Sequence, residues 1–271
     1  MGMLDGRVAI VTGATRSMGA AIARRLAAEG ARVAGLGRSP AEGEAIAASI
    51  RQAGGDAAFV PADIGSEESV AAAVHRTVTT FGRLDIIVNN AAATEILRVE
   101  GGVRAAEETT ERFDRMMKVG VYGPFWLAKY GIPHIIASGD GGSIVNIGSM
   151  SAHRVEGAML GYSTSKAAIE GFTRQLAHDY AADGIRVNNI VLGSIASDET
   201  AYLHNDPVNG SARARNRMIK KPGTPEDLAN LVLFLASDQS AYMTAAMVPL
   251  DGGAMATYPA PRIASTPVPT D

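Results

Sequence analysis

The chain has 271 residues, of which 46% are hydrophobic, and its formal net charge is −3. It contains no cysteine, which excludes a disulfide scaffold, a thiolate metal site and a cysteine nucleophile. The slight acidity argues against a nucleic-acid surface, which needs a basic stripe, and no apolar run approaches the about 18 residues of a membrane span. Since no signal peptide is evident either, we expect a soluble, cytoplasmic protein that binds neither nucleic acid nor membrane.

Short apolar runs alternate with amphipathic segments along the chain. We expect strands at 7–12, 31–36, 57–61, 84–89, 142–147, 186–191 and 247–250. We expect helices at 20–29, 40–52, 66–81, 162–182 and 225–236, and a long helix that follows a polar stretch (94–108) and ends near residue 137. The alternation indicates right-handed βαβ units. It predicts a doubly wound α/β fold, in which a mainly parallel seven-stranded sheet carries helices on both faces.

The alternation runs without a linker or an internal repeat, so we expect one catalytic domain over residues 1–256. An irregular segment, at about 193–222, follows the sixth expected strand. Residues 257–271 contain four prolines and are not expected to join the core. This tail is either disordered or reaches across a subunit interface.

A polar turn, from Gly13 to Gly19, follows the first expected strand. Glycines at both of its ends allow the backbone to approach a pyrophosphate, whose charge is stabilised by the N-terminus of the next helix. A turn with a purely structural role is the alternative. The position of this turn between a strand and a helix favours a dinucleotide site.

The end of the second expected strand bears on the choice of cofactor. A site for NAD usually has Asp or Glu here to bind the 2′-hydroxyl of the ribose, whereas a basic residue accommodates a 2′-phosphate. This chain has Gly37 followed by Arg38, and Arg16 in the first turn could reach the same phosphate. We therefore expect NADP as the cofactor. NAD is the alternative if both arginines are ordinary surface charges.

Tyr162 and Lys166 open the helix expected at 162–182, and their spacing places them on one helical face. Tyrosine titrates near about 10 and is a poor base at neutral pH, but a neighbouring ammonium stabilises its phenolate and lowers its pKa. Ser149, at the end of the fifth expected strand, can hold a substrate oxygen and stabilise alkoxide charge. These residues predict interconversion of a carbonyl and an alcohol, with Tyr162 as acid or base and a nicotinamide as hydride carrier.

An ordered series of motifs carries a family resemblance. It comprises Thr12-Gly13 to Gly19, Asp63, Asn89-Asn90-Ala91-Ala92, Ser149, Tyr162 to Lys166, Arg186-Val187-Asn188 and Asp251-Gly252-Gly253. From about residue 4 to residue 256 the chain resembles the short-chain dehydrogenase/reductase family. The resemblance implies a Rossmann-like fold, with Ser149 orienting the substrate oxygen and Tyr162 as the acid/base. It also implies that Lys166 lowers the Tyr162 pKa and binds the nicotinamide ribose.

The resemblance further implies which residues contact the cofactor and how subunits assemble. Gly13, Thr15, Arg16, Met18 and Gly19 would line the adenosine phosphates, Asp63 and Ile64 the adenine, Asn90 the adenosine-side ribose, and Ile195 the nicotinamide. The segment at 193–222 resembles the family's mobile substrate lid. Members are usually homotetramers or homodimers, in which the two long helices, here ending near residues 137 and 182, form a bundle between subunits.

The sequence departs from the family pattern mildly at Ser17 and more consequentially at Gly120. Ser17 stands where the middle glycine of the turn is usual, so this position must tolerate a Cβ atom. Gly120 falls where the family usually has the asparagine of a proton relay, in which a water bonds the backbone carbonyl of that residue. Because Gly120 keeps the carbonyl, our hypothesis is that catalysis persists, with a looser helix and a slower relay.

Apolar residues around the expected site indicate a largely hydrophobic substrate without identifying it: Met150, Val155, Met159, Leu160, Leu192, Tyr202 and Leu203. The histidines lack metal-ligand spacing, so we expect no metal. A non-catalytic dinucleotide-binding or scaffold protein with this fold is the alternative from another functional class. Gly120 and Ser17 favour that alternative slightly, whereas the intact Ser149, Tyr162 and Lys166 argue strongly against it.

Overall fold

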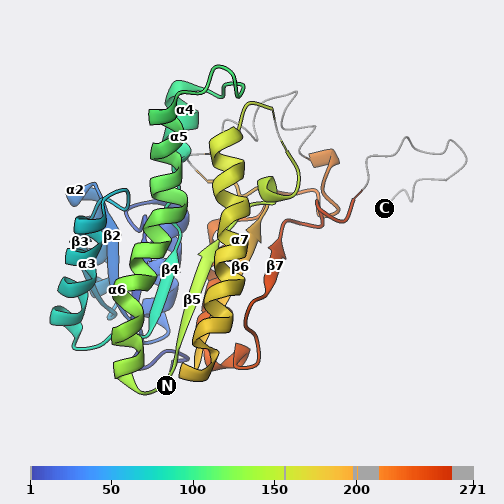
Figure 1. Ribbon diagram of the computed structural model, residues 1–271. Coiled ribbons are helices and arrows are strands. Elements are labelled where there is room, and N and C mark those ends of the chain that lie inside the picture. Colours follow the sequence, from blue (N-terminus) through green and yellow to red (C-terminus); the bar gives the residue numbers. More distant parts are fainter. Residues whose placement is uncertain (1, 156, 198–199, 201–213, 258–271) are drawn as a thin grey trace, which may run out of the picture.

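The computed structural model describes residues 2–155, 157–197, 200 and 214–257. Within these residues seven strands form one sheet: β1 (Val8–Thr12), β2 (Arg32–Gly37), β3 (Asp56–Pro61), β4 (Ile86–Asn89), β5 (Gly142–Ile147), β6 (Ile185–Leu192) and β7 (Met247–Leu250). The α-helices of the same residues are α1 (Ser17–Ala28), α2 (Pro40–Gln52), α3 (Glu67–Phe81), α4 (Thr94–Glu100), α5 (Thr110–Met117), α6 (Gly123–Ser138), α7 (Leu160–Tyr180) and α10 (Pro225–Ala236). All neighbouring strands pair in parallel, so the predicted doubly wound α/β fold is confirmed (Figure 1).

Helices cover both faces of the sheet and close a hydrophobic core on each face. Buried residues of α1, α2 and α10 form one core, and buried residues of α3, α6 and α7 form the other. Ala9 and Val11 of β1 belong to the first core, whereas Val8 and Ile10 belong to the second. Because both faces of β1 are covered, its sequence is a continuous apolar run rather than an alternating one.

The order of the strands creates the place where a ligand can bind. The order is β3-β2-β1-β4-β5-β6-β7, so the chain reverses its direction across the sheet between β1 and β4. The chain segments that leave β1 and β4 therefore run in opposite directions across the sheet. A crevice forms between them, at the carboxyl ends of these two strands. The turn at 13–19 and Asn90 both follow these strand ends.

The region before α6 differs from the sequence prediction. The expected polar stretch contains α4, and the expected long helix consists of α5, a π-helical turn η1 (Lys118–Tyr122) and α6. A new helix starts after Thr109, because the Thr109 side chain accepts a hydrogen bond from Arg112 N. None of the residues of α4 is buried, so this seven-residue helix has no buried apolar face like those of the predicted helices.

Two expected segments lie largely outside the described residues. The lid expected at 193–222 includes residues 198–199 and 201–213, and the tail expected at 257–271 is described only at Thr257. The division into a domain at 1–256 and a tail therefore stays a prediction. Within the described ranges, no helix is long and apolar enough to cross a membrane.

Ser17, the first residue of α1, has an unusual backbone conformation. Its φ is +48°, in the left-handed region, which costs about 1–2 kcal/mol for a residue that carries a Cβ atom. Its hydroxyl oxygen is buried and has no hydrogen-bond partner in the part of the chain that the structure describes. The helix starts here rather than at residue 20 as predicted, since residues 17–19 already continue the helix.

We expect Ser17→Gly to raise the free energy of unfolding by about 1 kcal/mol, because glycine relieves the left-handed strain and removes an unpaired buried hydroxyl. Ser17→Ala is the matched control, since it removes the hydroxyl and keeps the Cβ atom. Urea unfolding followed by circular dichroism measures both variants. A glycine variant no more stable than the alanine variant would contradict the strain argument.

Candidate active site

Thr12, the last residue of β1, joins the two strands that flank the crevice. Its hydroxyl donates to Val88 O of β4 at 3.3 Å and accepts from the backbone N–H groups of Asn90 and Ala91, each at 2.9 Å. The Asn90 side chain returns a hydrogen bond, from Nδ2 to Thr12 O at 2.8 Å. Sequence reasoning included Thr12 in a motif but missed this role. The available signal was a polar residue at the end of an otherwise apolar strand.

The turn after Thr12 closes through contacts that require glycine. Gly13 has a φ of +66°, and a Cβ atom at Gly19 would lie 2.0 Å from Gly13 O and 2.8 Å from Asn90 Nδ2. Met18 packs against the core formed by α1, α2 and α10. The glycines expected to admit a pyrophosphate therefore also let the turn fold onto itself, which brings the N-terminus of α1 to the crevice.

The crevice has one feature that fits a bound nucleotide. Asn90 Oδ1 is buried and has no hydrogen-bond partner among the described residues. A buried carbonyl oxygen needs a donor, and the hydroxyl of a ribose is one. This feature agrees with the ribose contact that the family resemblance implies for Asn90.

At the end of β2, a side chain at position 37 would require Thr15 to move. A Cβ atom at Gly37 would lie 2.5 Å from Thr15 Cγ2, so the turn after β1 occupies that volume. The lack of an acidic residue at position 37 favoured NADP in the sequence analysis. The packing of Thr15 gives a second reason for glycine at this position. Thr15, expected to line the phosphates, thus lies against the end of β2.

Arg38 is engaged with a residue that the sequence analysis did not consider. Its Nη2 lies 2.5 Å from Oε2 of Glu95 in α4, and both side chains are at least half exposed. The hydrogen bond from Arg38 lowers the pKa of Glu95, and the charges of Arg16 and Arg98 act in the same direction. The charges of both Arg16 and Arg38, which the sequence analysis assigned to a 2′-phosphate, therefore act on one carboxylate of α4.

The other residues expected at the cofactor differ in how accessible they are. Asp63 is exposed, and its Oδ1 accepts a hydrogen bond from Gly65 N at 2.9 Å, which shapes the turn after β3. Ile64 is 6% exposed, with its side chain against the first residue of α6, Gly123. Ile195 is also 6% exposed and packs on Gly223. The side chains of Ile64 and Ile195 therefore belong to the core.

Ser149 and Lys166 are connected through the backbone of β5. Ser149 caps a short 3-10 turn η2 (Met150–Ala152), where its Oγ accepts from Ser151 N at 3.1 Å. Lys166 Nζ donates to Ile147 O at 2.6 Å, the carbonyl two residues before Ser149. The same Nζ lies 5.7 Å from the centroid of the Tyr162 ring. The three predicted residues thus meet where β5 ends and α7 begins.

Lys166 is a buried cation. It is 6% exposed, and burial lowers its pKa to about 8. At neutral pH it still carries its proton, because its pKa lies above that pH. An ammonium above an aromatic ring is attracted to the ring and stabilises negative charge that develops on a nearby phenol oxygen.

The loop after Ser149 is held at two further points. His153 Nε2 lies 2.6 Å from Oε1 of Glu170, which is on α7 one turn beyond Lys166. Arg154 Nη2 donates to Met255 O at 3.2 Å. These contacts brace the serine loop against α7 and against the segment after β7.

Part of the expected apolar lining is present beside the start of α7. A hollow of about 500 Å³ is lined there by Val155, Met159 and Leu160, together with Ser151 and Ala152. Leu192, by contrast, is buried in the core. Met150 is not among the residues that line this hollow, and Tyr202 and Leu203 lie outside the described residues.

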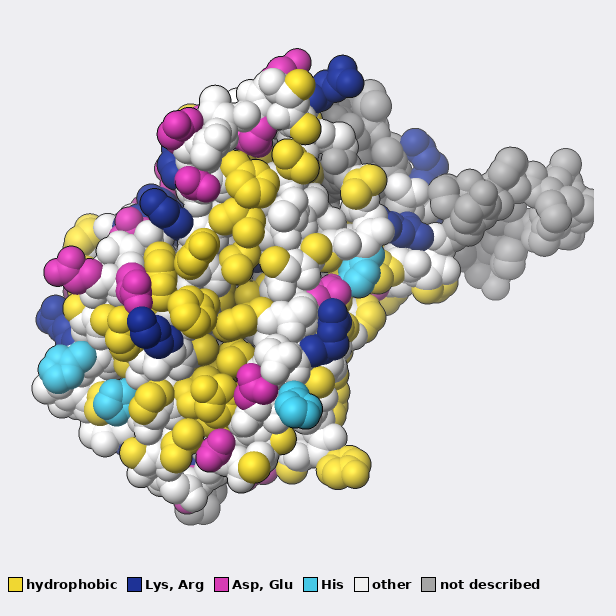
Figure 2. All heavy atoms as spheres, in the orientation of Figure 1, with side chains coloured by type: hydrophobic (Ala, Val, Ile, Leu, Met, Phe, Trp, Pro, Cys, Tyr) yellow, Lys and Arg dark blue, Asp and Glu magenta, His cyan; other side chains and the backbone are white. Residues whose placement is uncertain are grey.

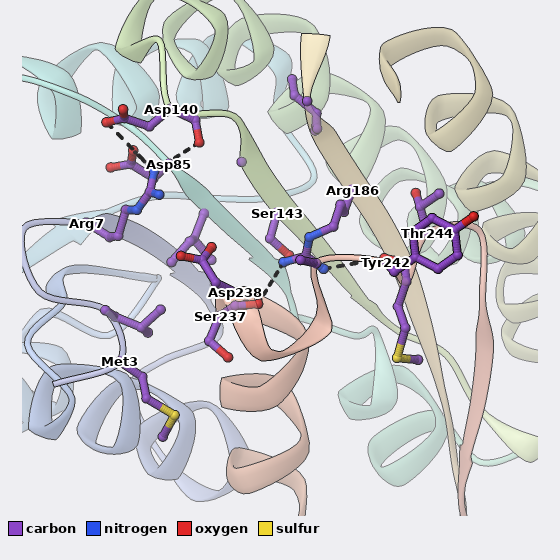
Figure 3. Close-up of a pocket in the computed structure, with 18 of the residues that line it drawn as sticks. Met3, Arg7, Asp85, Asp140, Ser143, Arg186, Ser237, Asp238, Tyr242 and Thr244 are labelled. Carbon is purple, nitrogen blue, oxygen red and sulfur yellow. Dashed lines mark hydrogen bonds and ion pairs between the residues drawn. The ribbon is translucent and has the colours of Figure 1, made fainter. Parts of the chain in front are cut away.

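A hollow of about 540 Å³ opens at the opposite, amino-terminal edge of the sheet, and none of the predicted site residues lines it (Figure 3). Its charged groups are already occupied. Asp85, which is 1% exposed, accepts from Val8 N at 2.8 Å and pairs with Arg7. Arg186 donates to Ser237 O at 3.1 Å and so ties β6 to the loop before β7. These contacts indicate a structural role.

Known proteins share this arrangement over nearly the whole chain. The family model described as enoyl-(acyl carrier protein) reductase matches residues 13–255. A 7alpha-hydroxysteroid dehydrogenase of Clostridium sardiniense is 36% identical over 253 residues, which cover 93% of this chain and 95% of the relative. The chain belongs to the short-chain dehydrogenase/reductase family. It is therefore an oxidoreductase of that family, as the motif series predicted.

Two solved structures extend the comparison to the fold. A short-chain dehydrogenase from Burkholderia cenocepacia, in complex with NADP, has a TM-score of 0.84 and 34% identity, covering 93% of this chain and 99% of that one. A blue fluorescent protein from a metagenomic library, in complex with NADPH, has a TM-score of 0.84 and 33% identity, covering 93% of this chain and 98% of that one.

Gly120 stands where the family resemblance implies an asparagine, and its surroundings leave little room for a side chain. Gly120 is buried in η1, where a Cβ atom would lie 2.7 Å from both Cβ and Oγ of Ser165. Ser165 Oγ in turn donates to Tyr162 O at 2.7 Å. Glycine at 120 therefore allows η1 to pack directly against the turn of α7 that carries Tyr162 and Lys166.

We expect Gly120→Ala to cost about 1–3 kcal/mol of stability and to lower turnover, because its Cβ atom forces η1 and α7 apart. Asparagine carries the same Cβ atom, so Gly120→Asn is expected to lower turnover too. In a Ser165→Gly background, the alanine substitution should cost much less, since the clashing atoms are gone. Thermal unfolding and steady-state rates of the single and double variants measure this coupling.

Gly157→Ala is the matched control, because a Cβ atom there meets open space and the substitution should be close to neutral. A large gain in turnover for Gly120→Asn would instead mean that the native protein lacks an effective proton relay.

Proposed function

We propose that this chain is an NADP(H)-dependent oxidoreductase that interconverts a carbonyl and a secondary alcohol. The observation that carries the proposal is the position of the Lys166 ammonium, buried beside the Tyr162 ring and bonded to the carbonyl two residues before Ser149. This arrangement concentrates a phenol, an ammonium and a hydroxyl at the carboxyl end of β5.

The roles of these residues follow from their chemistry. A bound nicotinamide supplies or accepts the hydride. During reduction, Tyr162 gives its phenolic proton to the substrate oxygen, and the Lys166 charge stabilises the phenolate left behind. Ser149 Oγ accepts from Ser151 N, which fixes the oxygen and leaves the hydroxyl proton to be donated to the substrate oxygen. Lys166 also binds the nicotinamide ribose in this proposal.

Several observations support NADP over NAD. Gly37 offers no carboxylate that would repel a 2′-phosphate, and Arg38 lies next to it at the end of β2. Two structurally similar proteins are in complex with NADPH or NADP. Gly13, Gly19 and Asn90 are assigned to cofactor binding in general, and their contacts in the turn after β1 do not distinguish NADP from NAD. NAD remains the alternative cofactor for the same reaction.

The substrate class is proposed to be a largely apolar ketone or secondary alcohol. The apolar hollow beside α7 supports this, as does the name of the hydroxysteroid dehydrogenase that is 36% identical.

A cytoplasmic location stays a prediction from the sequence.

We expect Tyr162→Phe to lower the rate of carbonyl reduction by at least about 100-fold, because the variant keeps the ring and loses the proton donor. The absorbance of NADPH, followed with a panel of apolar ketones, measures the rate. Tyr180→Phe is the matched control, since Tyr180 ends the same helix far from Ser149 and should leave the rate unchanged.

If neither NADPH nor NADH is oxidised with any ketone, or if Tyr162→Phe has no effect, the enzymatic proposal fails. Tight binding of NADPH without turnover would then favour the non-catalytic, dinucleotide-binding alternative.

We further propose that α6 and α7 form an interface between copies of this chain, giving a homodimer or homotetramer. An apolar band runs over these helices in Figure 2. Exposed apolar residues of η1 and α6 are Tyr122, Phe125 and Ile136, with exposed fractions of 51%, 44% and 43%. Side chains at these spacings recur along one side of a helix, and large exposed apolar surfaces mark interaction sites.

We expect Phe125→Glu to shift the protein to a smaller assembly, because it places a charge in the apolar band. Light scattering after gel filtration measures the molar mass. Val99→Glu is the control, since Val99 is 69% exposed but lies on α4, outside the band. A wild-type protein that is already monomeric would contradict the proposed interface.

A further inference from the structure

The ion pair between Arg38 and Glu95 occupies the group that a 2′-phosphate would need. In dinucleotide sites of this fold, an arginine near the end of the second strand accommodates that phosphate. Arg38 is in that position, and its Nη2 is instead 2.5 Å from Oε2 of Glu95. An internal carboxylate thus contacts the arginine at the place where an incoming anion would bind.

More than one positive charge acts on the carboxylate of Glu95. Arg38 donates to it, and Arg16 and Arg98 also act electrostatically on its carboxylate. Arg38 is therefore one of three arginines whose positive charge acts on this single carboxylate. A phosphate monoester, with a charge of about −1.5 to −2 and three acceptor oxygens, matches this set better than a single carboxylate does.

Helix α4, which carries Glu95, has half-buried apolar side chains only at Ile96 and Leu97 and forms an ion pair near each end. None of its residues is buried. At its carboxyl end, Glu100 pairs with Arg115 of α5 at 2.8 Å. At its amino end, Glu95 pairs with Arg38. Since an exposed ion pair contributes little free energy, the amino end of α4 can separate from Arg38 at small cost.

We propose that Glu95 is an internal competitor for the 2′-phosphate, so that NADP binding displaces its carboxylate from Arg38 and releases the amino end of α4. The inference rests on the proposed NADP-dependent function and deepens it. NAD, which has a hydroxyl at this position, leaves the ion pair in place. Glu95 then determines how strongly the site prefers NADP to NAD, and α4 distinguishes the two cofactors.

The test is the equilibrium binding of NADPH and NADH, measured by titration calorimetry without a substrate. Glu95→Gln keeps the size of the side chain and removes its charge. We expect it to tighten NADPH binding by about three-fold, the size expected for loss of one exposed competing ion pair, with a smaller change for NADH. Adenosine 2′,5′-bisphosphate should show the same gain, and adenosine 5′-monophosphate should not.

Two further variants serve as controls. Glu100→Gln, on the same helix, breaks the pair with Arg115 and should leave the ratio of NADPH to NADH affinity unchanged. In an Arg38→Ala background, Glu95→Gln should lose its effect on NADPH, because the group for which the two anions compete is absent.

Amide hydrogen exchange provides an independent measurement. Residues 94–97 should exchange faster with NADPH bound than with NADH bound.

The possible failures are distinguishable. If Arg38→Ala weakens NADPH but Glu95→Gln leaves the affinity ratio unchanged or lowers it, the competition is wrong and the NADP proposal stands. If Arg38→Ala leaves NADPH binding unchanged, the proposed 2′-phosphate site itself is wrong. Equal exchange of α4 with both cofactors would also overturn the proposed release.

Discussion

The buried ammonium of Lys166 is the constraint on which the candidate site depends. A charge removed from water needs compensation, and here its hydrogen bond goes to the backbone carbonyl of Ile147. That bond sets the position of α7 relative to β5, and therefore the position of Tyr162 relative to Ser149. The pKa of about 8 reflects the same burial, which holds the ammonium close to the pH range where it can exchange a proton.

Three glycines show how packing constrains a residue that has no side chain. Gly19 admits the carbonyl of the turn, Gly37 admits Thr15, and Gly120 admits Ser165. Each glycine is adjacent to a different part of the proposed site, namely the parts assigned to the phosphates, to the ribose and to Tyr162. The same chemical property, absence of a Cβ atom, therefore serves close approach of backbone segments rather than flexibility.

Much of the fold could be predicted from the sequence, because buried parallel strands are continuous apolar runs and helices have apolar periodicity. The residues of the site could be predicted because a strand end and a helix start bring them to one edge. Helix α4 could not, since it buries nothing. The contact of Glu95 with Arg38 could not either, because it joins residues 57 positions apart through side chains that are exposed and carry no pattern.

The link between Thr12 and Asn90 has a consequence for synthesis of the protein. It joins residues 78 positions apart, and β1 lies in the middle of the sheet between β2 and β4. On the ribosome, β1 and its glycine turn emerge early but have no β4 to pair with until Asn90 has left the exit tunnel. β1 can pair with β2 on one side during this interval, but its other side stays unpaired until β4 has emerged, and chaperones can bind it there.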